Sequence, residues 1–138
     1  MELIIGLVFA AGVGIATTLL GMDRDRSLYP ATLIVIAFIY ELFAVMGGST
    51  HALTLESCFA VVFIGLAVAG FRWSLWLTVA GLAGHGIFDF FHGYIIQNPG
   101  VPTFWPMFCL TYDVAAAAYL AILILNHRIR GISTATEG

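Results

Sequence analysis

Long apolar segments separated by short polar stretches dominate this sequence. Five of them are about 18–23 residues long, which is enough to cross a hydrocarbon core of about 30 Å as a helix. They cover residues 3–20, 29–47, 53–71, 74–96 and 105–126. The separators are short, so no length remains for a soluble domain. The pattern predicts an all-α integral membrane protein, a five-helix transmembrane bundle in which residues 1–130 form a single transmembrane domain and residues 131–138 a polar C-terminal tail.

The arginines predict how this bundle is oriented. Every cationic side chain is an arginine, and these are Arg24, Arg26, Arg72, Arg128 and Arg130. With five spans, all of them fall on the same side of the membrane. Cytoplasmic loops carry an excess of Lys and Arg, so this side is expected to be cytoplasmic. We therefore expect the N-terminus outside, the C-terminus in the cytoplasm, and a multi-pass protein in the cell inner membrane.

The composition agrees with a membrane protein and excludes several functions. Hydrophobic residues make up 61% of the chain and charged residues only 9%, whereas a soluble domain has about 45–50% and 25%. The formal net charge of −3 argues against a nucleic-acid partner, which would require a basic face. The absence of lysine excludes a Schiff base to retinal or pyridoxal. No phosphate-binding glycine loop is present. The expected partners are therefore membrane lipids and a small-molecule or lipid substrate.

A stripe of small residues runs along the first apolar segment. Gly6, Ala10 and Gly14 recur every four residues and lie on one helix face. Such a stripe lets two helices approach closely in a membrane. It predicts either a contact within the chain or the face of a homodimer.

Ionisable residues inside the apolar segments are the main indication of function. Charged groups are costly in a membrane, so each is a candidate for a functional site. The segments contain Glu41, Glu56, His85, Asp89, His92 and Asp113. At a rise of about 1.5 Å per residue, all six lie roughly 5–15 Å from the outer ends of their segments, in the half of the bilayer away from the arginines. This shared depth predicts one polar site built from four helices.

The fourth segment carries three of these groups on one face. His85, Asp89 and His92 are spaced i, i+4, i+7, which places them within about 60° of arc on a helix. Imidazole and carboxylate together form the ligand set of zinc, iron, manganese or copper. We expect His85 and His92 to bind a divalent metal, with zinc first and Fe, Mn or Cu as alternatives. Asp89 is expected to be a further ligand, or to orient an imidazole.

Carboxylates from other segments are expected to complete the site. Asp113 is predicted as a further metal ligand or a catalytic group, Asp89 as a second catalytic candidate, and Glu41 as a general base or a partner of the ligands. Glu56 lies nearer the surface and is expected to be solvated. The loop at 97–106 holds three prolines, so we expect a rigid lid over the site.

The polar positions of the last two segments form a recognisable series. It reads His85-x3-Asp89-x2-His92, Asn98-Pro99, Pro102 and Cys109-x3-Asp113. The series resembles a family of small bacterial multi-pass membrane proteins classed as a domain of unknown function, over roughly residues 81–121. Those proteins often carry Trp before the Asp and a paired His-His, where this chain has Phe88 and a single His92. The resemblance implies that these positions form one site and implies no activity.

A looser similarity concerns ligand chemistry alone. Intramembrane metal hydrolases of the ceramidase and adiponectin-receptor type combine three His with Asp and Ser around zinc, on seven spans instead of five, so the likeness is an analogy. The leading hypothesis is a metal-dependent membrane enzyme, hydrolase-like, that acts on a lipid or another amphiphile. The alternatives are a proton- or cation-coupled transporter or channel that uses Asp89, Asp113 and Glu41, a non-catalytic membrane subunit, and a polar network that only holds the helices together.

Overall fold

Five long α-helices account for most of residues 1–129, the part of the chain that the computed structural model describes. They are α1 (Glu2–Leu20), α2 (Leu28–Met46), α3 (Thr50–Arg72), α4 (Leu75–Ile95) and α5 (Trp105–Leu125), with a 3-10 turn η1 (Met22–Arg24) after α1. No helix end differs from its predicted position by more than three residues. The prediction of five helices at these positions is therefore confirmed. Arg130 and the predicted tail at 131–138 lie outside the described residues.

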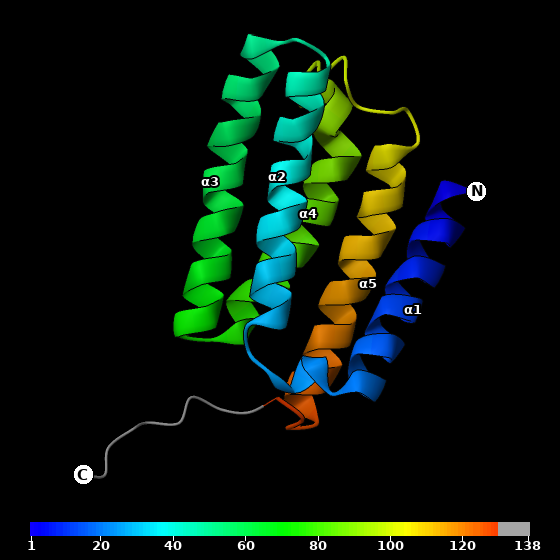
Figure 1. Ribbon diagram of the computed structural model, residues 1–138, viewed down its shortest axis with the longest axis vertical. Helices are drawn as coiled ribbons and strands as arrows, with labels where there is room; N and C mark the ends of the chain where they lie inside the picture. The colour runs from blue at the N-terminus through cyan, green and yellow to red at the C-terminus, as the bar shows by residue number, and fades with distance from the viewer. Residues whose placement is uncertain (130–138) are drawn as a thin grey trace.

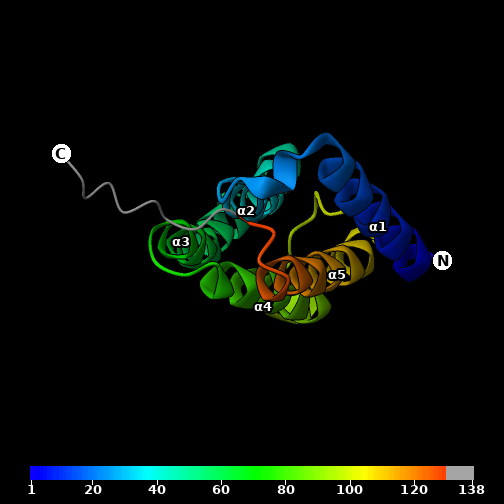
Figure 2. The same ribbon diagram turned by 90° about the horizontal axis from the view of Figure 1, so that it is seen from below.

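The helices stand side by side in one up-and-down bundle (Figure 1). α5 packs between α4 and α1, α3 packs against α2 and α4, and α2 also touches α4. Seen from below, α4 and α5 form one side of the bundle and α2 faces them from the other, with α1 and α3 at opposite edges (Figure 2). The interior between α2, α3, α4 and α5 is where the functional residues lie.

Four helices, α1, α2, α3 and α5, are long and apolar enough to cross a membrane. Their outward side chains are large and hydrophobic, as Phe9, Val35 and Val61 illustrate with exposed fractions of 56%, 62% and 69%. A water-soluble bundle of this size would not expose such a surface. These helices therefore suggest a membrane protein.

α4 is not one of these four, and its polar residues explain why. His85, Asp89 and His92 lower the average hydropathy of the helix, yet all three are buried inside the bundle. The outward side of α4 presents Phe90 and Phe91 instead, each 48% exposed. The surface that α4 turns outward is therefore as apolar as that of its neighbours.

The small-residue stripe of α1 is used within the chain. Gly6, Ala10 and Gly14 are the buried residues of α1. A side chain on Gly6 would collide with the carbonyl of Phe108, and one on Gly14 would press on the ring of Tyr119. Both partners belong to α5, so the stripe is what allows α5 to lie close against α1. Of the two interpretations of the stripe, the structure shows the contact within the chain.

Candidate metal centre

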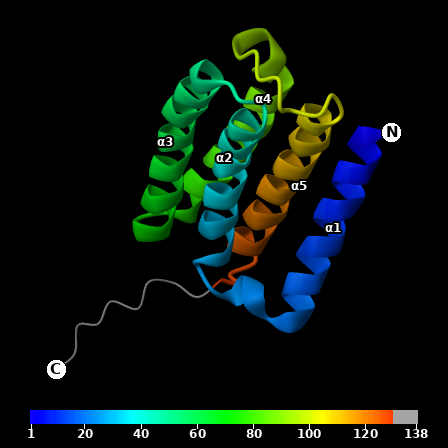
Figure 3. The ribbon, with the colours of Figure 1, turned by 45° about the horizontal axis from the view of Figure 1, so that its top comes forward.

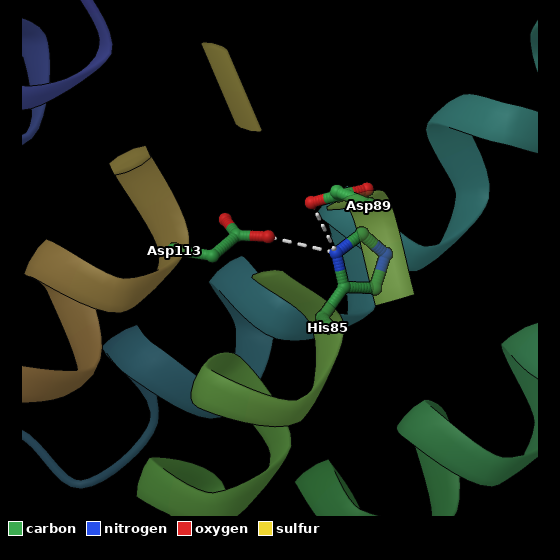
Figure 4. A group of neighbouring side chains, drawn as sticks. All are labelled: His85, Asp89 and Asp113. Carbon is green, nitrogen blue, oxygen red and sulfur yellow. Dashed lines mark hydrogen bonds and ion pairs between the residues drawn. The ribbon is translucent and has the colours of Figure 1, made fainter. Parts of the chain in front are cut away.

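Three buried side chains converge at the centre of the bundle (Figure 4). His85 and Asp89 come from α4, and Asp113 comes from α5. The Nδ1 atom of His85 lies 2.7 Å from Oδ2 of Asp113 and 3.3 Å from Oδ2 of Asp89. All three residues are at most 1% exposed. One ligand atom from each lies within 4.8 Å of the others, a grouping that could hold a metal ion.

The local sequence accounts for this convergence. His85 and Asp89 are four residues apart on α4, so they stand one above the other on a single face. Gly86 lies next to them on the side of α4 that faces α5, against the carbonyl of Leu110 and the Cβ atom of Asp113. A larger residue at that position would push α5 away. The glycine therefore lets α5 bring Asp113 within hydrogen-bond distance of His85.

Two carboxylate oxygens of the group lack a partner. Among residues 1–129, Oδ2 of Asp89 and Oδ1 of Asp113 are buried and accept no hydrogen bond; we call them the unpaired oxygens. His85 lies 3.3 Å from the first of them, but not in hydrogen-bond geometry. Buried polar groups are nearly always hydrogen-bonded, because leaving one unpaired costs about 1–3 kcal/mol. The unpaired oxygens therefore indicate that the site holds something more, such as a cation, a proton or a water.

Tyr40 of α2 joins the group from the opposite side of the bundle. Its hydroxyl donates a hydrogen bond of 2.7 Å to Oδ1 of Asp89. Its ring stacks on the imidazole of His92, with centroids 4.1 Å apart and an interplanar angle of 16°. Tyr40 therefore fixes one oxygen of Asp89 and leaves the other free, as a residue that orients a metal ligand does.

His92 belongs to a second group, nearer the end of the bundle. Its Nε2 atom lies 2.8 Å from Oε1 of Glu56 on α3. The amide of Asn98 donates to the same Glu56 oxygen, at 2.9 Å, and to the carbonyl of Tyr40, at 3.1 Å. Figure 3 shows the α4–α5 loop that carries Asn98 passing over this end of the bundle beside α2. The loop thus lies over the second group, where we expected a lid.

Glu56 corrects one expectation from the sequence. We expected this carboxylate to be solvated, because it lies only two turns from the start of α3. It is instead 2% exposed, because His92 from α4 and Asn98 from the loop both bind it. Position along the helix predicts a place near one end of the bundle, but it could not show that the loop covers that end.

Glu41 and His92 lie outside the group around His85. Glu41 is half-buried, and its side chain makes no hydrogen bond or ion pair within the described chain. Successive residues of a helix point about 100° apart, so α2 cannot direct both Tyr40 and Glu41 at the centre. The imidazole of His92 is one further turn along α4 and reaches Glu56 on α3 instead of Asp113. The six predicted residues therefore form two adjacent groups, linked by Tyr40, with Glu41 apart from both.

Sequence reasoning missed Tyr40, and it placed Asn98 at the site only through the family resemblance. Tyr40 is a polar-tipped ring within an apolar segment, and Asn98 is an amide within a proline-rich loop. Neither side chain is charged, so neither met the criterion of an ionisable residue inside an apolar segment. One signal for Tyr40 was available in the sequence. A tyrosine within a membrane span needs a hydrogen-bond partner for its hydroxyl, and carboxylates at the same depth can provide it.

The distances around His85 suit a small divalent ion with a modest adjustment. Zinc ligands lie about 2.0–2.2 Å from the metal in tetrahedral geometry, so two of them stand roughly 3.3–3.5 Å apart. The 3.3 Å between Nδ1 of His85 and Oδ2 of Asp89 matches this spacing. The 2.7 Å to Oδ2 of Asp113 is the length of a hydrogen bond. A bound ion would therefore require His85 and Asp113 to stand slightly farther apart.

Comparison with protein-family models, with curated proteins and with solved structures finds no match. The resemblance stated from the sequence therefore stays a prediction. The geometry of the chain's own residues is what any functional proposal must rest on.

Proposed function

We propose that this protein is a metal-dependent membrane enzyme, hydrolase-like, that acts on a lipid or another amphiphile. One observation carries the proposal: His85, Asp89 and Asp113 bring three potential ligand atoms within 4.8 Å of one another, and two of the carboxylate oxygens have no partner within residues 1–129. Three protein ligands with room for a fourth are typical of catalytic metal sites, whereas structural sites use four.

The charge of the site supports a bound cation. Two carboxylates and one imidazole are fully buried, and no arginine in the described part of the chain forms an ion pair with them. Even with a protonated imidazole, two ionised carboxylates leave a net negative charge in a medium where an uncompensated ion is very unfavourable. A divalent metal would offset it; a proton shared between the carboxylates is the other solution.

The residues have distinct roles in this proposal. His85, Asp89 and Asp113 hold the metal, and Tyr40 orients Asp89. A metal held there supplies an activated water for hydrolysis. Hydrolysis would form a bond from the water oxygen to the electrophilic atom of the substrate and break the bond to the leaving group; the unpaired oxygen of Asp113 would accept the proton that the water loses and pass it to the leaving group. Glu41 is not given a catalytic role, because Tyr40 occupies the inward face of α2.

Metal analysis combined with a chelator titration tests the proposal. Protein purified without added metal should contain about one divalent ion per chain, and a chelator should lower its melting temperature, because a ligand that binds only the folded state stabilises it. Zinc is the first candidate, with Fe, Mn or Cu as alternatives. Protein that carries no stoichiometric metal, and is not stabilised by adding any of these ions, would overturn the metalloenzyme proposal.

A proton or cation pathway is the second candidate function. A series of polar groups supports it, because Asn98, Glu56, His92, Tyr40 and Asp89 follow one another from the α4–α5 loop to the centre of the bundle. In this case the native protein should be insensitive to chelators. It should also show a pH-dependent flux in vesicles, and Asp89→Asn should remove this flux.

The proposal also includes an orientation: five helices span the membrane, and the end of the bundle that carries the arginines faces the cytoplasm. Arg26 donates to the carbonyls of Gly70 and Phe71 at the end of α3, and Arg24, Arg72 and the end of α5 lie at the same end of the bundle (Figure 1). By the positive-inside rule we propose that this end faces the cytoplasm, with the protein in the cell inner membrane.

Reporter fusions test this orientation. A reporter after Arg72 should be cytoplasmic, and one in the α4–α5 loop at Asn98 should lie outside. The physical reason is that α4, although less apolar on average, turns only hydrophobic side chains outward. A cytoplasmic reporter at Asn98 would overturn the orientation; if the reporter after Arg72 is cytoplasmic as well, α4 does not cross the membrane.

A further inference from the structure

The polar groups inside the bundle continue from the candidate metal centre toward one end of the molecule. Tyr40 contacts both groups, because its hydroxyl bonds Asp89 and its ring stacks on His92. His92 binds Glu56, and Glu56 accepts the amide of Asn98 from the α4–α5 loop. On α4, His92 is three residues from Asp89, about 5 Å by helical rise. A series of polar side chains therefore joins the candidate metal centre to the end of the bundle under this loop.

An apolar layer closes the bundle in the other direction, toward the end that carries the arginines. It takes one buried side chain from each of α2, α3, α4 and α5: Leu33, Phe63, Leu82 and Leu120. Leu82 is three residues before His85 on α4, so it lies about 5 Å nearer the arginines. The other three stand seven residues from Tyr40, Glu56 and Asp113, which is about two turns along the same helix faces. Every buried histidine, aspartate and glutamate of α2–α5 in the described chain lies on the loop side of this layer.

The apolar layer is tightly packed. Its three leucines are 0% exposed, and a Cβ atom on Gly81 would collide with the side chain of Leu33. The ring of Phe63 meets the imidazole of His85 edge-on, with centroids 4.7 Å apart. An ion that crossed this layer would lose its water with no polar group to replace it, which is very unfavourable. The layer therefore blocks the exchange of ions with the arginine end.

Two contacts hold the α4–α5 loop over the second group (Figure 3). The amide of Asn98 donates to Oε1 of Glu56 at 2.9 Å and to the carbonyl of Tyr40 at 3.1 Å. Gly100 lies against the end of α2, where a Cβ atom would collide with the carbonyl of Phe43. Both contacts belong to the loop, so the loop can open locally while the helices stay packed. An open loop exposes the His–Glu pair beneath it to water.

We propose that Glu56 and His92 form the entry site through which the metal reaches its centre. With the loop open, this imidazole and this carboxylate bind an incoming divalent ion. The ion then moves about one helical turn inward, past Tyr40, to the candidate metal centre. When the loop closes, the amide of Asn98 takes the place of the ion on Glu56. This inference rests on the proposed function and adds the route by which that site is loaded.

The kinetics of metal exchange test the role of the loop. Zinc-loaded protein in detergent is mixed with an excess of a chromophoric chelator, which reports the rate of loss, and metal-free protein is mixed with zinc for the rate of loading. Asn98→Ala, which removes both amide bonds, should raise both rates about tenfold, because losing one hydrogen bond to a charged group favours the open loop by about that factor. The zinc affinity, which is the ratio of the two rates, should stay the same. Gln97→Ala is the matched control, because the amide of Gln97 bonds the carbonyl of Gly93 instead, and its rates should be unchanged.

Two further variants separate an entry site from a general loosening of the bundle. Gly100→Ala displaces the loop from α2 without changing a side chain of the second group, and should speed exchange as Asn98→Ala does. His92→Phe keeps a ring stacked on Tyr40 but removes the imidazole, and should slow both loading and loss at unchanged metal content. A role of His92 in stability alone would give the opposite sign, because a loosened bundle exchanges its metal faster.

The direction of metal loss in vesicles tests the apolar layer. A chelator that does not cross membranes is added outside vesicles that hold zinc-loaded protein in both orientations. It should remove zinc only from the molecules whose α4–α5 loop faces outward. That fraction is measured on Gln97→Cys protein with an impermeant maleimide, after subtraction of the labelling of the unchanged protein.

The outcomes distinguish this inference from the proposed function. Zinc-binding protein whose exchange rates do not respond to Asn98→Ala and Gly100→Ala, or whose zinc leaves toward both sides of the vesicle, would overturn the entry site alone. Faster exchange in His92→Phe would do the same. Protein that binds no stoichiometric metal would overturn the proposed function and the entry site with it.

Discussion

Asp113→Asn is expected to abolish stoichiometric metal binding and to remove most of the stabilisation that the metal provides. An amide replaces a charged carboxylate as the third ligand, and His85 loses its partner at 2.7 Å. At a metal concentration about 1,000-fold above the dissociation constant, the lost stabilisation amounts to roughly 4 kcal/mol. Metal content per chain and melting curves with and without a chelator measure both effects.

Glu41→Gln is the matched control for this variant. Glu41 is a carboxylate at a similar predicted depth, but it is half-buried and makes no hydrogen bond to the group around His85 within the described residues. The variant should keep its metal and its response to the chelator. Loss of metal in Glu41→Gln, or retention of metal in Asp113→Asn, would show that the ligand set has been assigned wrongly.

Gly6→Leu is expected to separate α1 from α5 and to destabilise the bundle by several kcal/mol. Gly6 faces the carbonyl of Phe108 and the side chain of Thr111 with no space for a side chain. Overfilling a packed contact costs about 1–3 kcal/mol even where the neighbours can move, and a backbone carbonyl in a helix cannot. Thermal unfolding in detergent measures the change.

Gly12→Leu controls for the effect of a leucine on α1 itself. Gly12 lies on the same helix, and a side chain added there meets no atom within 4 Å among the residues that the structure describes. The variant should unfold at or slightly above the temperature of the unchanged protein, because leucine favours the helix over glycine by roughly 1 kcal/mol. Equal destabilisation by Gly6→Leu and Gly12→Leu would contradict the close α1–α5 contact.

The positions of the helices were predictable from the length and hydropathy of the apolar segments. An apolar segment of this length has to satisfy its backbone internally, so hydropathy alone locates the helices. The pairing of His85 with Asp89 was also predictable, since spacing along one helix determines it. The approach of Asp113 followed less directly, from its similar predicted depth alone.

The remainder of the site depends on how the helices are rotated, which depth and spacing do not determine. Tyr40 and Glu41 are neighbours at nearly the same depth, and the rotation of α2 directs the uncharged one of the two inward. Likewise Glu56 is buried because α3 turns it toward His92. These rotations result from packing against particular partners, and no periodicity in a uniformly apolar helix reveals them.

The contact between the first and the last helix has a consequence for biosynthesis. The stripe of α1 can contact its partner only when α5 has been made, and 84 residues lie between Leu20 and Trp105. At about 5–20 residues per second, α1 would wait in the bilayer for roughly 4–17 s with its glycines facing lipid. Asp113 is inserted at the same late step. On this proposal the candidate metal centre could not form during synthesis of the first four helices, and loading with metal would follow the insertion of the fifth.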